Sequence, residues 1–262
     1  MTIASLDGYI AAAKQKPVIK KTTSKATTGL LPFTIFDVGG IPAAGVLSPG
    51  NTANGIVPTD AIQGYPPISV IGATGYLARV IYTWNVIGNL HLYDEVFACG
   101  AYAYNADITL ASQPSYVARM PASSYVNTEL WYECVTAISS AQSIQVNYLD
   151  QDGNAGDTGV IAFGIAPTQG RMFRLPLAAG DSGISQITRV RSTGATAGTF
   201  NIIVMRPLWM GRISVVNEIK VDDLLKTGMP QVYDTSALYL VAEPDSTATG
   251  TNLQVMMEIA DG

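Results

Sequence analysis

The chain has 262 residues, of which 48% are hydrophobic and only 13% are charged, about half of the roughly 25% usual for globular proteins. Its apolar residues form no uninterrupted run near the roughly 18 residues that a membrane span needs, which argues against a membrane protein. Two cysteines, Cys99 and Cys134, allow at most one disulfide and exclude a disulfide-stabilised scaffold. The first residues show no basic stretch before an apolar one, so we expect no secretory signal and synthesis in a reducing cytoplasm.

The shortage of charge favours a protein that assembles with other subunits. A monomer rarely exposes large contiguous apolar patches, so a chain this poor in charge needs a surface to cover them. The alternative is a large monomer whose surface consists of its many Ser, Thr, Asn, Gln and Gly residues. Because low charge indicates association only indirectly, we keep both readings and favour assembly.

The charge is also unevenly distributed along the chain. Five of the seven lysines lie in the first 25 residues, beside a single acid, Asp7, while the other 237 residues hold 10 basic and 19 acidic side chains. The five are Lys14, Lys16, Lys20, Lys21 and Lys25. Basic N-terminal arms often bind nucleic acid, but this one has no Arg and only Tyr9 as an aromatic. We therefore favour a solvated tail or an arm that docks on an acidic neighbouring subunit, and consider nucleic-acid binding unlikely.

The first predicted element is a short helix within residues 2–16. Thr2 or Ser5 would cap it, and Leu6 and Ile10 share one of its faces. From residue 20 to residue 67, frequent Gly and Pro predict an extended arm with short apolar groups. So long a segment without periodic elements is unusual inside a compact domain. We therefore predict two parts: residues 1–67 as helix and arm, and residues 68–262 as a folded body.

The body is predicted to consist of antiparallel strands. Runs rich in Val, Ile, Tyr, Phe and Thr alternate with Gly, Asn, Asp and Ser clusters. The runs cover residues 76–84, 89–93, 129–137, 143–149, 158–164, 171–175, 184–192, 199–206, 237–243 and 252–260. Within them Ile144, Val146 and Tyr148 alternate with polar neighbours, as expected for one buried face. About ten short strands favour an all-β antiparallel sandwich of jelly-roll type with one or two short helices.

The links between strands predict further local structure. Small polar loops at residues 150–157, 193–198 and 245–251 are typical of hairpins. A helix is expected from an N-cap at Asn217 to Gly228, and residues 94–99 are expected to form one helical turn.

The residues that usually carry chemistry give no predicted catalytic, metal or cofactor site. The single histidine, His91, lies in an apolar strand and fits a structural role, and the two cysteines lie far apart and fit the core. The acidic loop from Asp150 to Asp157 begins like a calcium loop but lacks the required Gly and Glu, so we interpret it as a hairpin tip, with a calcium site of another type left open.

Aromatic side chains in loops keep carbohydrate binding as a rival function. Tyr102, Tyr104, Tyr116 and Tyr125 are expected to be exposed, and exposed aromatics stack on sugars or anchor protein interfaces. A glycan hydrolase would need paired carboxylates across a cleft, which the sequence neighbours Asp222 and Asp223 do not indicate.

Five segments give the chain a family resemblance, at residues 5–12, 40–45, 92–94, 227–234 and 237–240. On them the chain resembles a virion structural protein of tailed bacteriophages, of the type that decorates or cements the capsid. The resemblance implies a non-enzymatic homotrimer on the capsid surface, made in the host bacterial cytoplasm, with a jelly-roll body and an arm that binds the major capsid protein. The alternative within the same setting is a receptor- or carbohydrate-binding module of a tail or head fibre.

Clamping of neighbouring subunits is the mechanism that this reading predicts. An arm that becomes ordered on binding loses conformational entropy at that moment. The burial of surface between subunits compensates for this loss. The expected apolar anchors are Leu6, Ile10, Leu30, Leu31, Phe33, Ile35 and Phe36. The five lysines of residues 1–25, a segment that we call the leader, would contact an acidic capsid surface. On this reading a chain without residues 1–40 still folds.

Overall fold

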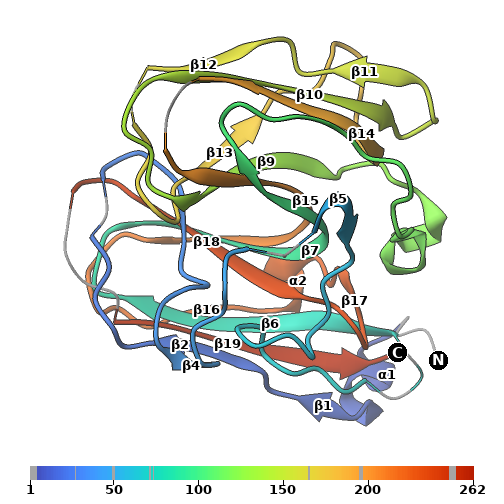
Figure 1. Cartoon of the computed structure of the whole chain (residues 1–262). Coiled ribbons are helices and arrows are strands. Elements are labelled where there is room, and N and C mark those ends of the chain that lie inside the picture. The colour runs from blue at the N-terminus through green and yellow to red at the C-terminus, as the bar shows by residue number, and fades with distance from the viewer. Residues whose placement is uncertain are drawn as a thin grey trace. The chain divides into compact units, whose positions relative to one another are not determined.

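The computed structural model describes nearly the whole chain (Figure 1). The described residues are 5–26, 28–48, 51–70, 72, 74–164, 166–194, 197–247 and 252–262. The predicted cap Thr2 lies outside them.

The chain forms two compact units, each built from separate stretches of sequence. Unit 1 consists of Met1–Val46, Thr59–Asp94 and Leu208–Gly262, and unit 2 of Leu47–Pro58 and Glu95–Pro207. Residues 1–67 therefore contribute to both units. The predicted division between residues 67 and 68 does not coincide with the division that the structure shows.

Unit 1 is a sandwich of two antiparallel sheets. Its elements are α1 (Leu6–Ala11), β1 (Lys14–Gln15), β2 (Val18–Lys21), β3 (Phe33–Thr34), β4 (Gly40–Ile41), β6 (Thr74–Trp84), β16 (Lys220–Asp222), α2 (Leu224–Thr227), β17 (Gln231–Tyr233), β18 (Leu238–Pro244) and β19 (Leu253–Asp261). One sheet, which we call sheet A, has the order β16-β6-β19-β2-β4, with β1 beside β19 and β17 beside β6. The other contains β18 between β3 and the first residues of β7 (Gly88–Ala103).

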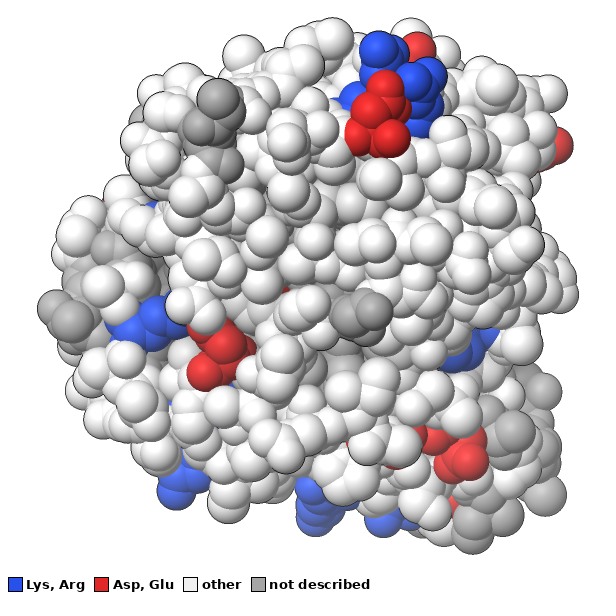
Figure 2. Space-filling model, viewed as in Figure 1, with Lys and Arg blue, Asp and Glu red and all other residues white. Residues whose placement is uncertain are grey.

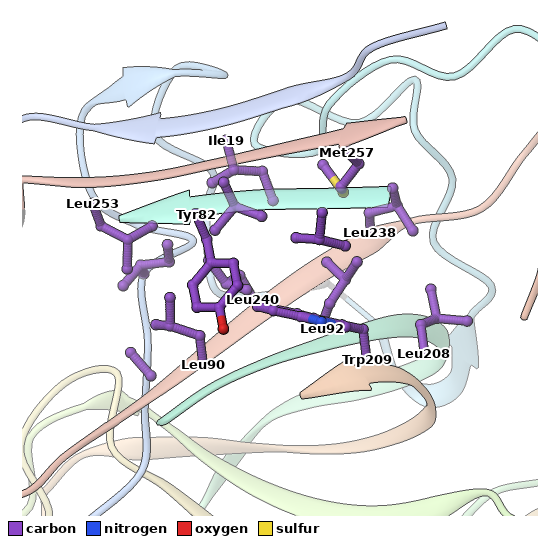
Figure 3. Packing of buried hydrophobic residues seen from close by; sticks show 14 of the residues in the cluster. Ile19, Tyr82, Leu90, Leu92, Leu208, Trp209, Leu238, Leu240, Leu253 and Met257 are labelled. Atoms are coloured by element: carbon purple, nitrogen blue, oxygen red, sulfur yellow. The ribbon is translucent and has the colours of Figure 1, made fainter. Parts of the chain in front are cut away.

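Alternating side chains explain why these strands enclose a core. Along β6 the residues Val80, Tyr82 and Trp84 are at most 1% exposed, while the intervening Ile81 and Thr83 are half-buried. Sheet A and the β18 sheet turn their buried faces toward each other around the cluster in Figure 3, where Ile19, Tyr82 and Met257 face Leu90, Leu92 and Leu240. This core provides the hydrophobic driving force for unit 1.

Unit 2 is a second antiparallel sandwich with its own aromatic core. Its elements are β5 (Asn51–Ile56), β8 (Asp107–Thr109), the 3-10 helices η1 (Val117–Arg119) and η2 (Pro121–Ser123), β9 (Glu129–Thr136), β10 (Gln142–Asp150), β11 (Ala155–Asp157), β12 (Ile161–Phe163), β13 (Met172–Leu175) and β14 (Ile184–Thr193). Strands β7 and β15 (Thr199–Ile213) contribute residues to both units. One sheet has the order β11-β10-β14-β8 with β12 beside β10, and the other includes β13, β9 and β15. Tyr104, Tyr132 and Phe200 stack at its centre, with ring centroids 4.9 to 5.6 Å apart for the pairs with Phe200.

The predicted all-β fold class is confirmed, since the described residues form antiparallel β-sandwiches with two short α-helices. Each of the ten predicted strands overlaps an observed one. The hairpin at residues 150–157 is confirmed by the pairing of β10 with β11. The other two hairpins are wrong, because β14 and β15 belong to different sheets and so do β18 and β19. These links cross from one sheet to the other.

The position of the first helix was predicted correctly, whereas the start of the second was not. Helix α1 begins after Ser5, whose side chain accepts a hydrogen bond from the Gly8 amide, within the predicted range. Helix α2 begins only after Asp223, which caps the Leu225 and Lys226 amides, so Asn217 is not its cap. The glycine at 228 ends it in the left-handed conformation, as predicted.

Two segments predicted as helical are strands. Residues 94–99 form no helical turn, because they continue β7. The residues before α2 form β16, which pairs with β6. Its Asp222 carboxylate accepts hydrogen bonds from Trp209 Nε1 at 2.9 Å and Lys226 Nζ at 2.6 Å, which hold the strand in place. Among the described residues, no helix has the length and apolarity to span a bilayer.

Candidate interaction surface

The predicted arm anchors divide into residues that the fold buries and residues that it exposes. Phe33, Ile35 and Phe36 are only 3%, 1% and 8% exposed and belong to the interior of unit 1. The Phe36 ring contacts Tyr65 and Tyr239, with ring centroids 4.6 and 5.4 Å apart. These three anchors therefore stabilise the unit itself and are not available to a partner in this structure.

A close backbone approach keeps the Phe36 ring in place. A Cβ at Gly45 would lie 2.1 Å from the ring, and one at Gly64 would lie 2.4 Å from it. Gly64 also has a φ of +114°, which side chains rarely adopt. The glycines that suggested a loose arm in the sequence thus serve the packing of one buried aromatic residue.

Two of the five leader lysines are also turned inward. The Lys21 side chain is buried, and its Nζ donates to the Pro42 carbonyl at 3.0 Å. Burial lowers the pKa of Lys21 to about 8, against the opposing effect of Asp37. Lys25 donates to the Thr34 carbonyl at 2.9 Å and pairs with Asp37. These contacts fasten the segment to its own unit.

The remaining predicted contact residues are accessible, with Leu31 half-buried. Leu6 and Ile10 on α1 are 63% and 65% exposed, and Leu30 is 71% exposed. No residue of α1 is buried, so its apolar face has no cover within the described residues of this chain. Three lysines of the leader, Lys14, Lys16 and Lys20, are exposed as well.

Strand register creates an apolar row on the outer face of sheet A. Val221 pairs with Ile81, Ile81 with Met256, and Met256 with Val18, so these four side chains lie side by side across β16, β6, β19 and β2. We call these four residues the outer row. Val221 is 55% exposed, and the other three are half-buried, whereas their strand neighbours Tyr82 and Val255 are buried in the core. A sheet face usually carries polar side chains at such positions.

Basic side chains border the outer row. Lys20 lies in the next cross-strand row, paired with Gln254 and Ile41, and Ile41 is 62% exposed. On the opposite side Lys16 lines a shallow depression together with Arg79 and Met256. Figure 2 shows that charge is sparse on the face in view, where small charged groups stand amid uncharged surface.

Helix α1 is attached to this face through one buried carboxylate. Glu258 Oε1 accepts a hydrogen bond from Tyr9 Oη at 2.5 Å, and its Oε2 pairs with Arg79 Nη2 at 2.6 Å. Burial would raise the pKa of Glu258, but the Tyr9 hydrogen bond and the Arg79 ion pair outweigh it and hold the pKa below its ordinary value. Since Arg79 and Glu258 neutralise each other, Lys16 and Lys20 give the border of the row a positive charge.

The outer row was missed from the sequence because it depends on strand register. Ile81 and Met256 occupy the positions of β6 and β19 that alternation assigns to the open face, and this is the one signal that the sequence contains. That four such positions lie in one row follows only from the pairing of strands far apart in sequence. Chemically, the surface suits a protein partner that presents apolar and acidic side chains.

The residues considered for chemistry have structural surroundings. His91 Nε2 lies 3.6 Å from Glu243 Oε2 on the neighbouring strand β18. Cys99 and Cys134 are free and buried, which confirms their place in the core, and burial raises their thiol pKa values to about 12 and 11. Among the described residues no three His, Cys, Asp or Glu side chains are grouped as metal ligands would be.

The acidic loop is a hairpin tip, as predicted. The Asp150 carboxylate accepts hydrogen bonds from the Asp152 and Asn154 amides, each at 2.8 Å. These bonds lower the pKa of Asp150 against the effect of desolvation. Its oxygens thus stabilise the turn.

The expectation of exposed loop tyrosines is wrong for three of the four. Tyr102, Tyr104 and Tyr116 are at most 3% exposed and pack in the core of unit 2, and Tyr125 is half-buried in an edge contact with Tyr116, at a centroid distance of 5.3 Å. They leave no aromatic platform for a sugar.

Comparison with known proteins does not assign the chain to a family. No family model matches it, and no curated protein matches it. Two solved structures of infectious bursal disease virus, from strains Gt and Gx, are 9% and 8% identical to it. Both comparisons cover 95% of this chain and 81% and 80% of theirs, with TM-scores of 0.19 and 0.13. Similarity at this level carries no argument about fold or function.

Proposed function

We propose that this protein is a non-enzymatic virion structural protein that decorates and cements the capsid of a tailed bacteriophage. It would be made in the host bacterial cytoplasm, assemble as a homotrimer, and lie on the capsid surface, where it clamps neighbouring copies of the major capsid protein. It would use no cofactor, no membrane and no nucleic acid. The resemblance described above supplies the setting.

The observation that carries the proposal is the outer row with its basic border. Apolar residues in register across four strands, left partly open to water, cost solvation free energy that a protein partner recovers on binding. The lysines beside them would steer the protein to an acidic capsid surface and fix its orientation. Many copies on a lattice would add individually weak contacts into a large stabilisation.

We restrict the proposed capsid contacts to those predicted residues that are accessible in the fold. Leu6, Ile10, Lys14, Lys16, Lys20 and Leu30 are exposed and Leu31 is half-buried, so these residues remain the proposed contacts. Phe33, Ile35, Phe36, Lys21 and Lys25 act inside unit 1 and would support the surface from behind. The clamp is therefore a folded sheet face with a short helix, and not a long free arm.

A charge placed in the outer row tests the proposal. We expect Val221→Glu to abolish co-sedimentation of the full chain with capsids assembled without it, because a carboxylate there would be desolvated at the interface. Val160→Glu is the matched control, since Val160 is also exposed, at 71%, but lies in unit 2. Both variants should keep the wild-type circular dichroism spectrum and melting temperature.

The binding of the two variants and the behaviour of the wild-type protein together test the proposed function. Loss of binding in Val221→Glu with normal binding of Val160→Glu supports the proposal, and light scattering of the wild-type protein should give the mass of a trimer. Normal decoration by Val221→Glu would reject this face as the contact, and a wild-type chain that ignores capsids would reject the cement function.

A further inference from the structure

Unit 2 contains a cleft that the proposed function does not use. Its volume is about 740 Å³, within the range of about 300–1,000 Å³ that small-molecule sites occupy. It opens where β9 begins and β13 ends, next to the loop that precedes β14. Six of its eleven lining residues are polar or charged and the other five are Leu or Pro.

Apolar residues line part of the cleft. Pro176 and Pro207 are exposed and Leu177 is half-buried, so these three present apolar surface. Leu130 and Leu175 pair directly across β9 and β13, but they are at most 2% exposed and belong to the core of unit 2. Strand β9 is paired on both sides, with β13 and β15, which helps to hold this side of the site in place.

Two carboxylates that line the cleft each accept a hydrogen bond from an aromatic side chain. Glu129 Oε2 accepts from Trp131 Nε1 at 3.0 Å, and its Oε1 lies 3.2 Å from Arg174 Nη1. Asp181 Oδ2 accepts from Tyr148 Oη at 2.7 Å. The Arg174 side chain is 64% exposed, so it can reorient toward a bound molecule while Glu129 keeps its Trp131 contact.

The loop beside them is fixed by hydrogen bonds. Asn127 has a φ of +66°, and its amide donates to the Ser182 carbonyl at 2.7 Å. The Thr128 hydroxyl accepts from the Ile184 amide at 2.8 Å. The left-handed conformation at Asn127 is uncommon outside glycine and occurs within the lining of this cleft.

We infer that this cleft binds a carbohydrate. Carboxylates, a guanidinium, an amide and hydroxyls are the groups that pair with vicinal sugar hydroxyls, which both donate and accept. The exposed Pro176 and Pro207 and the half-buried Leu177 suit the apolar C–H face of a pyranose. The lining has two carboxylates and one arginine, so its negative charge disfavours an anionic ligand such as a phosphate. Its six polar or charged residues would lose hydration without gaining partners, which disfavours a purely apolar ligand. The site is independent of the capsid-binding face on unit 1.

Saturation-transfer NMR on the full chain tests this assignment, with free hexoses, N-acetylhexosamines and their disaccharides as probes, followed by titration calorimetry. We expect at least one neutral sugar to bind with a Kd of about 1 mM or tighter. Asp181→Asn, which can still accept from Tyr148, and Arg174→Ala should each weaken that binding at least about tenfold, the equivalent of one lost charged hydrogen bond.

The controls are Asp152→Asn, at the hairpin tip, and Arg191→Ala, an exposed arginine on β14 that does not line the cleft. Both should bind the sugar like the wild type, and all four variants should melt within a few degrees of it. Absence of binding to every sugar would overturn the inference. So would sugar binding that survives unchanged in both Asp181→Asn and Arg174→Ala.

Discussion

Residues 33–36 and residues 5–16 lie in the same N-terminal segment, and both combine apolar groups with nearby lysines, yet the fold treats them in opposite ways. The first group is buried, with Ile35 1% exposed, and Lys25 beside it is paired with Asp37. The second exposes Leu6 and Ile10 by more than 60% and leaves Lys14 and Lys16 open to solvent. The difference lies in what each group meets: β3 joins β18, while α1 touches its unit mainly through Tyr9.

The comparison teaches that apolar composition does not by itself separate a partner contact from a core residue. A Gly- and Pro-rich segment without long strands can still supply strands and core to a sandwich whose other strands come from distant sequence. Residues 18–21 pair with β19, more than 230 positions along the chain. The following experiments test where the boundary between the two groups lies.

Deletion of residues 1–40 should have the largest effect. It removes β2, β3 and the core side chains Ile19, Phe33, Ile35, Phe36 and Val38. Loss of a single large core side chain costs about 2 to 5 kcal/mol, against a total stability of about 5 to 15 kcal/mol. We expect unit 1 to unfold, seen as lost near-ultraviolet circular dichroism. Deletion of residues 1–12 is the matched control and should leave the melt nearly unchanged. A cooperative wild-type melt after the long deletion would show that the segment is a detachable arm after all.

Single truncations sharpen the same boundary. Phe33→Ala should cost about 3 to 5 kcal/mol of unfolding free energy, because Phe33 lies in the main core cluster of unit 1. Leu6→Ala should change it by less than about 0.5 kcal/mol, as is usual for exposed positions. Urea denaturation at one pH measures both. Equal losses in the two variants would mean that α1 is part of the core.

Lys21 and Lys20 provide a pH test on one strand. The folded-state pKa of Lys21, about 8, lies below its ordinary value of 10.5. Below pH 8 the lysine is charged in both states, and the folded protein bears the cost of burying that charge. Between pH 8 and 10.5 the unfolded chain binds more protons, so the contribution of Lys21 to stability rises with pH, by at most about 1.4 kcal/mol per unit.

The stability difference between wild type and Lys21→Met should therefore change between pH 7.5 and 10, in favour of the wild type at the higher pH. Lys20→Met, on the exposed side of the same strand, is the matched control for loss of a lysine from β2. Urea titrations at several pH values measure it, and a flat difference for Lys21→Met would show that the ammonium is hydrated.

The sequence was sufficient for the strands with long alternating patterns. Residues 142–150 show the expected alternation of buried and half-buried side chains, and their hairpin was predictable from the polar loop that follows. It was insufficient for β16 and β17, because three-residue strands gain their stability from pairing with β6 and not from their own propensity.

The sequence also did not indicate which loops join strands of different sheets. A short polar loop can return a strand beside its predecessor or carry it to the opposite sheet, and local residues do not distinguish the two outcomes at residues 193–198. The candidate surfaces share this limit: Val221, Ile81, Met256 and Val18 become one row only through three separate strand registers. The N-terminal lysines were visible, but the pairing of β2 decides that Lys20 faces outward and Lys21 inward, and contacts to Thr34 and Asp37 turn Lys25 inward.

The exposed lysines should give the smallest effect, and one that depends on salt. Lys16→Gln and Lys20→Gln should each weaken capsid binding only about two- to fivefold at low salt, because exposed ion pairs contribute little and are screened. Near physiological ionic strength the loss should shrink, while the melting temperature stays at the wild-type value. Lys25→Gln is the opposite case, since it breaks the contacts to Asp37 and Thr34 and should lower stability without changing the salt dependence of binding. If Lys25→Gln instead altered binding as Lys20→Gln does, the division between inward and outward lysines would be wrong, and the whole leader would act as one electrostatic surface.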